Sequence, residues 1–128
     1  MPAEALGILL ISGTHERAHY AFMMAAGAAA LGRAVVLFAT NEGCRALMAG
    51  GVTGGLADDP RDAVALARGV AGLGELAEAA AELGVRRIAC EAGLRMIGAT
   101  GQELEAGVEV AGIATFLEAV GAGQIVTL

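Results

Sequence analysis

Short, uninterrupted apolar segments recur along this chain, and they constrain its fold more than any other feature. Residues 6–11 and 34–39 contain only aliphatic residues, phenylalanine and glycine. Such short continuous runs are typical of strands that are buried on both faces of a parallel sheet. Residues 85–89, which lead directly into Cys90, and residues 124–128 are two further candidate strands.

Segments with helical character separate these strands. The expected helices cover residues 15–31, 42–48, 73–83, 91–97 and 111–120. Residues 50–72 are predicted to form a long loop, within which 61–68 could be helical, and 104–110 a strand or loop. This alternation predicts an α/β, flavodoxin-like three-layer sandwich with a mostly parallel sheet of about five strands. A chain of 128 residues suits a single domain, over 1–128.

The charge pattern argues against nucleic acids and membranes as partners. The net charge is −6 and every basic residue except the two histidines is arginine, whereas a nucleic-acid partner requires a basic face. The longest stretch without acidic or basic charge, 18–32, is shorter than the ~20 apolar residues of a membrane span. The first residues lack the positive charge of a secretory signal, so we expect a cytoplasmic protein.

The composition also bears on assembly. Hydrophobic residues make up 56% of the chain, while aromatic residues make up only 3%. Much of the apolar surface therefore comes from small side chains, and a surface this apolar usually continues into a neighbouring subunit. We expect a homo-oligomer.

Polar or reactive residues follow three of the expected strands. Ser12, Gly13 and Thr14 come after the first strand, Asn41 comes after the second, and Cys90 ends the third. Ligands of parallel α/β sheets bind outside the carboxyl ends of the strands, which share one edge. The sequence therefore indicates Cys90 as the catalytic candidate and the other four residues as ligand-binding candidates.

Two interpretations of Cys90 stay open. Unpaired N–H groups at the start of the following helix favour a thiolate, and Arg95 lies one turn on, whereas the charge of Glu91 opposes this effect. The alternative is a buried cysteine that fills a tight strand-to-helix turn, since free cysteine is among the most buried residue types.

Arg95 is one candidate for an auxiliary role at this site, and Cys44 and His15 are two more. Cys44 is either a resolving or sulfur-accepting thiol or, as we favour, a small buried residue. His15 is either a base or anion ligand at a helix start or a polar neighbour of the cap, and His19 shares its helix face. Without a Cys-x-x-Cys motif or a ligand-pair spacing, we expect neither a metal site nor a cofactor.

Two blocks of sequence resemble a known family. The first is Ile-Ser-Gly-Thr at 11–14 with Ala-Ala-Gly-Ala-Ala-Ala-Leu-Gly-Arg-Ala-Val-Val-Leu-Phe-Ala-Thr at 25–40 and a glycine at 43. The second is Ile-Ala-Cys-Glu-Ala-Gly-Leu-Arg-Met-Ile-Gly at 88–98, followed by Glu-Leu-Glu-Ala-Gly-Val-Glu-Val-Ala-Gly at 103–112 and Phe-Leu at 116–117. Together they resemble the DsrE/DsrF-like superfamily, in particular its branch labelled peroxiredoxin-like. The resemblance covers the chain except roughly residues 45–72.

This resemblance implies a flavodoxin-like fold, homo-oligomers that are commonly trimers or hexamers, and a sulfur relay. In members that keep the cysteine, its thiolate accepts a sulfane sulfur from a donor protein as a persulfide and passes it to an acceptor. The matching residue here is Cys90. No peroxidase motif is present, and Ala39, Asn41 and Glu42 stand where that branch has aromatic residues.

Two other functions remain as alternatives. One is a non-catalytic subunit of an oligomer, in which Cys90 is structural. The other is a small-ligand or nucleotide-binding module that uses residues 12–14, although these lack both the Gly-x-Gly-x-x-Gly spacing and a Walker lysine.

Overall fold

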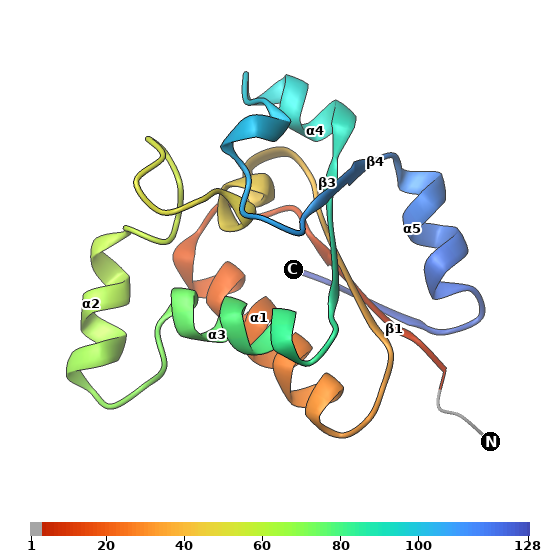
Figure 1. The fold of residues 1–128 in the computed structure, drawn as a ribbon, viewed down its shortest axis with the longest axis horizontal. Coiled ribbons are helices and arrows are strands. Elements are labelled where there is room, and N and C mark those ends of the chain that lie inside the picture. The colour runs from red at the N-terminus through yellow and green to blue at the C-terminus, as the bar shows by residue number, and fades with distance from the viewer. Residues whose placement is uncertain (1–3) are drawn as a thin grey trace.

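The computed structural model describes residues 4–128, in which strands and helices alternate (Figure 1). The strands are β1 (Leu6–Leu10), β2 (Val35–Ala39), β3 (Arg86–Cys90), β4 (Glu109–Ala111) and β5 (Gln124–Thr127). They form one sheet in the order β4-β3-β2-β1-β5, and every neighbouring pair is parallel. The predicted α/β fold with a parallel sheet of five strands is confirmed.

The helices are α1 (His15–Ala30), α2 (Pro60–Ala67), α3 (Leu73–Glu82), α4 (Glu91–Met96) and α5 (Ile113–Val120), with the 3₁₀ helices η1 (Asn41–Leu47) and η2 (Gly101–Glu103). Figure 1 shows α1 and α3 together over one face of the sheet and α5 over the other. This arrangement gives the three layers. In the part of the chain that is described, no helix is both long and apolar enough to cross a membrane.

The central strands β1 and β2 carry the continuous apolar runs because helices cover both of their faces. Ile8 is fully buried in the core cluster beneath α1 and α3, whereas Phe38 belongs to the cluster beneath α5. Phe38 stacks on Phe116 of α5, with ring centroids 5.0 Å apart. Gly7 allows this close approach, since a methyl group there would lie 2.5 Å from the Val120 side chain.

The short helix predicted for 42–48 is instead the 3₁₀ helix η1. The chain enters it through Asn41, whose φ of 50° lies in the left-handed region. Gly43 then packs against the Leu10 carbonyl so closely that a methyl group would overlap it. The Gly43 N–H donates to both Ile11 O and Thr40 O. This close packing against the end of β1 favours the narrower 3₁₀ helix over an α-helix.

The other differences lie where hydrophobic periodicity is weak. The region 50–72, predicted as a long loop with a possible helix at 61–68, contains the helix α2. The helix expected from residue 111 begins at Ile113, because residues 109–111 pair with β3 as the short edge strand β4.

The carboxyl ends of β1, β2 and β3 meet at one edge of the sheet, as expected. Gly13, after β1, sits against Glu42, after β2: a methyl group on Gly13 would lie 2.7 Å from Glu42 Cβ. Gly93 of α4 sits equally close to Thr40, 2.5 Å from its Oγ1 by the same measure. These glycine contacts bring the turns after the three strands together.

Candidate functional site

Cys90 is the last residue of β3 and the N-cap of α4. Its extended backbone, with φ −66° and ψ 124°, turns the chain into the helix and leaves Sγ as acceptor of the Gly93 N–H at 3.4 Å. Hydrogen bonds from N–H groups stabilise negative charge that develops on sulfur. The side chain is 8% exposed and packs with Phe38, Ile88 and Phe116 on the α5 side of the sheet.

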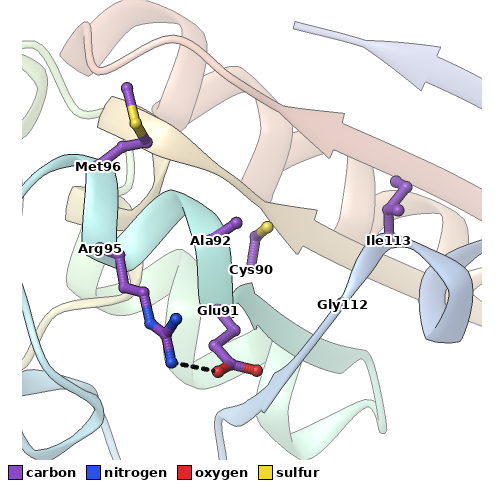
Figure 2. Close-up of a pocket in the computed structure, with 7 residues that line it drawn as sticks. All are labelled: Cys90, Glu91, Ala92, Arg95, Met96, Gly112 and Ile113. Carbon is purple, nitrogen blue, oxygen red and sulfur yellow. Dashed lines mark hydrogen bonds and ion pairs between the residues drawn. The ribbon is translucent and has the colours of Figure 1, made fainter.

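A cleft of about 530 Å³ opens beside this thiol, and Figure 2 shows its seven lining residues. They are Cys90, Glu91, Ala92, Arg95, Met96, Gly112 and Ile113. Met96 and Ile113 are 74% and 50% exposed, so the mouth of the cleft is apolar and open to solvent. Below, this site is called the Cys90 cleft.

Arg95 lines the Cys90 cleft, but its partner is Glu91. Arg95 Nη2 donates to Glu91 Oε1 at 2.9 Å, in the i,i+4 spacing that helices favour. In Figure 2 both side chains extend away from the Cys90 sulfur. The two opposite charges largely cancel, so the cleft presents the thiol in nearly neutral surroundings.

Cys44 lies close to Cys90 in very different surroundings. It is fully buried in the core cluster beneath α1, and its Sγ donates to Ala39 O at 3.5 Å. Burial, and next the charge of a nearby Cys90 thiolate, raise the pKa of the Cys44 thiol from 9.0 to about 11. Such a thiol stays protonated at neutral pH and is poorly suited to attack or resolve a disulfide.

The four ligand-binding candidates lie at the expected edge, but two of them are occupied in capping α1. Ser12 Oγ and Thr14 Oγ1 are 3.0 Å apart, and Ser12 Oγ also accepts from Thr14 N at 3.2 Å. Thr14 Oγ1 accepts from Arg17 N as the N-cap of α1. Gly13 packs against the Cβ and the backbone carbonyl of Glu42, whose carboxylate pairs with Arg45.

Asn41 sits at the same edge in its left-handed conformation, beside Gly93 of α4. Its side-chain Oδ1 accepts from Thr40 Oγ1 at 3.4 Å. Asn41 therefore shapes the turn against which α4 packs, although it does not line the Cys90 cleft.

His15 belongs to a different part of the molecule. Its Nε2 lies 2.8 Å from Asp62 Oδ1 of α2, and the His19 Nε2 donates to Ala71 O at 2.8 Å. The structure thus brings the two histidines together, with ring centroids 5.4 Å apart, but does not bring either to the Cys90 cleft. Among residues 4–128, no group of three or more His, Cys, Asp or Glu side chains could hold a metal ion.

Sequence reasoning missed Met96, Gly112 and Ile113 as lining residues of the Cys90 cleft. Gly112 and Ile113 follow β4, a strand of three residues whose side chains are mostly exposed. Ligands of parallel sheets bind outside the carboxyl ends of the strands, so recognition of 109–111 as a strand would have indicated Gly112 and Ile113 as site residues. Met96 carried no signal beyond its exposed place on a short helix.

Comparisons with known proteins identify the family from the sequence and a shared fold from solved structures. A model of the DsrE/DsrF-like family matches residues 5–128. The crystal structure of the ychN protein from E. coli is similar with a TM-score of 0.73 and 13% identity, covering 98% of this chain and 99% of that one. A protein of unknown function from Methanobacterium thermoautotrophicum, MTH1491, has a TM-score of 0.68 and 17% identity, with the same coverage. No curated protein matched the sequence.

Proposed function

This chain belongs to the DsrE/DsrF-like family, and on that premise we propose that it is a sulfur-relay protein whose Cys90 carries a sulfane sulfur between proteins. One observation carries the proposal. Cys90 Sγ accepts the N–H of Gly93 at the floor of an open cleft, where a small donor group can reach it. The second thiol, Cys44, is fully buried and has a raised pKa, which leaves Cys90 as the carrier.

The proposed chemistry is two successive thiol exchanges. The Cys90 thiolate attacks the terminal sulfur of a donor persulfide, R–S–SH. The donor S–S bond breaks, R–S⁻ leaves and takes up a proton, and Cys90 becomes a persulfide. An acceptor thiolate then attacks the terminal sulfur, and Cys90 leaves as a thiolate. The sulfane sulfur moves at constant oxidation state, so neither an oxidant nor a reductant is consumed.

The groups around Cys90 support these steps in different ways. The Gly93 N–H stabilises charge on Sγ both in the attacking thiolate and when Cys90 is the leaving group. Arg95 is the one cationic residue among the lining residues that the structure describes, and its pairing with Glu91 leaves it poorly placed to hold a small dianion. We therefore expect persulfides to be better donors than thiosulfate.

The proposal includes protein partners. Met96 and Ile113 border the thiol and expose most or half of their surface. A donor or acceptor protein can bury both side chains while it presents its own thiol to Cys90. A homo-oligomer, as a trimer or hexamer, remains part of the proposal, and light scattering after size-exclusion chromatography measures it.

Sulfur loading tests the proposal. Wild type, Cys90→Ser and Cys44→Ala are incubated with glutathione persulfide, freed of donor and weighed intact by mass spectrometry. We expect wild type and Cys44→Ala to gain one sulfur atom and Cys90→Ser to gain none. The loaded proteins should then lose that sulfur to added N-acetylcysteine, which becomes its persulfide. Loading that survives in Cys90→Ser, or a loaded Cys90 that transfers nothing, would contradict the proposal.

A further inference from the structure

A second cleft, of about 550 Å³, lies between α1 and α2, away from Cys90. Its walls include Glu16, His19 and Tyr20 of α1, Arg61 and Val64 of α2, and Arg68, the C-cap of α2. We propose that this α1–α2 cleft binds a small organic anion with a flat apolar body, of the chemical class of a nucleoside monophosphate. This activity is independent of sulfur transfer at Cys90.

The cleft is preformed because polar contacts fix both ends of α2. The side chain of Asp62 meets His15 Nε2 and also accepts from Leu73 N, each at 2.8 Å. Beyond the other end of α2, Ala71 O accepts from His19 at 2.8 Å. None of the residues of α2 is buried. The helix is therefore held at its ends while the face that it turns to α1 stays open.

The charges of this cleft favour an anion. Arg45, Arg86, Arg87 and Arg95 each pair with a glutamate elsewhere in the fold. By contrast, within residues 4–128 neither Arg61 nor Arg68 forms an ion pair, although acidic residues outnumber basic ones in this chain. Arg61 lies in α2 and Arg68 is its C-cap, seven positions or about two helical turns later, so both arginines lie on the side of the helix that lines the cleft. Unpaired guanidinium groups are suited to phosphate.

The remaining walls favour a planar, apolar body. Tyr20 and Val64 face the cleft from opposite helices and are 57% and 50% exposed. A flat ring that enters between them would bury both side chains and could stack on the Tyr20 ring. The cleft volume lies within the ~300–1,000 Å³ range of small-molecule sites. Glu16 on the opposite wall disfavours a ligand with negative charge at both ends.

Calorimetric titration with AMP, GMP and UMP tests this assignment, with adenosine and inorganic phosphate as partial ligands. At least one nucleotide should bind. Adenosine and inorganic phosphate should each bind at least about tenfold more weakly, because adenosine lacks the phosphate and inorganic phosphate lacks the flat apolar body. The double variant Arg61→Gln/Arg68→Gln should lose about tenfold in affinity for that nucleotide. Arg17→Gln removes one positive charge from α1 outside the cleft, half of the change in the double variant, and should bind as wild type does.

The fluorescence of Tyr20 supplies a second readout of nucleotide binding. Tyr20 is the only tyrosine of a chain without tryptophan, so aromatic emission comes mainly from this cleft. Nucleotide binding should change that emission, after correction for light absorbed by the nucleotide against free tyrosine. The proposal is overturned if none of the three nucleotides binds, or if binding is as strong in the double variant as in Arg17→Gln.

Discussion

Cys44 lies near enough to Cys90 for the charge of a Cys90 thiolate to raise its pKa, yet the two pack in different core clusters, Cys44 beneath α1 and Cys90 beneath α5. Cys44 Sγ donates to a backbone carbonyl, whereas Cys90 Sγ accepts from a backbone N–H and lines an open cleft. The two thiols therefore have opposite hydrogen-bonding surroundings, one as a donor inside the core and the other as an acceptor beside a cleft. This contrast gives the Cys90 cleft its single candidate nucleophile, and it leads to the predictions below.

The thiols should differ in reactivity. In native protein at neutral pH, iodoacetamide should alkylate Cys90 and leave Cys44 unmodified, because only Cys90 reaches a cleft. In denaturant both should react. Peptide mapping after brief exposure measures the two rates, and faster modification of Cys44 than of Cys90 in the native protein would be incompatible with this arrangement.

Stability should fall in alkali because of Cys44. Its pKa is raised from 9.0 to about 11 in the folded chain, so between these values the unfolded chain loses the proton first. The contribution of the neutral Cys44 thiol to the free energy of unfolding is thus fully present below pH 9. It is lost as pH rises toward 11, and the loss amounts to roughly 2–3 kcal/mol. Urea unfolding of wild type and Cys44→Ala at pH 8 and pH 10.5 checks this. The variant should lose less stability over that interval, and equal losses would argue against a buried neutral thiol.

Gly93→Ala should destabilise the site. Its new methyl group would meet Thr40 Oγ1 at 2.5 Å and the Asn41 backbone even more closely, which should cost about 1–3 kcal/mol and displace the N–H bonded to Cys90. Gly74→Ala is the matched control: Gly74 is an exposed residue of α3, a methyl group there would have nothing within 4 Å, and the variant should gain about 0.5–1 kcal/mol. Thermal unfolding of both variants measures the difference, and equal midpoints would refute the packing argument.

The contact between Asp62 and His15 that holds α2 should weaken in acid. Partial burial alone would raise the pKa of Asp62, but hydrogen bonds from His15 and Leu73 N outweigh it and bring the pKa below 3.8. A lowered pKa contributes stability above the unfolded value, and that contribution is lost as pH falls through the folded one. Asp62→Ala should therefore cost about 1 kcal/mol at pH 7 and little in strong acid.

Limited trypsin digestion at pH 7.5 gives a local readout of the same contact. Trypsin cleaves after Arg61 of α2 and after Arg68, the C-cap of this helix, and both bonds should be cut faster in Asp62→Ala than in wild type because the helix end is released. Unchanged cleavage at these two sites would show that Asp62 does not hold α2 in place.

The central fold was predictable from local sequence, whereas the clefts were not. β1 and β2 were recognisable because burial on both faces produces continuous apolar runs. Cys90 could be selected because it ends such a strand. The pairing of Arg95 with Glu91 follows from their i,i+4 spacing on one short helix, although it was not anticipated.

Contacts between distant segments left no local pattern. His15 contacts Asp62, which lies 47 positions away in the sequence. Because α2 buries no side chain, it has no hydrophobic stripe from which the helix or its contact with α1 could be predicted. Ile113 reaches the Cys90 cleft only because β4 pairs beside β3. A strand of three residues with exposed side chains is too weak a signal to predict that pairing.

The location of the transferred sulfur tests the central claim most directly. Wild-type protein is loaded with glutathione persulfide, its sulfur groups are blocked by alkylation and it is digested with trypsin. The tryptic fragment 88–95 contains Cys90, and fragment 34–45 contains Cys44. The account predicts an extra sulfur on fragment 88–95 and none on 34–45. An extra sulfur on 34–45, or on neither fragment, would contradict Cys90 as the carrier.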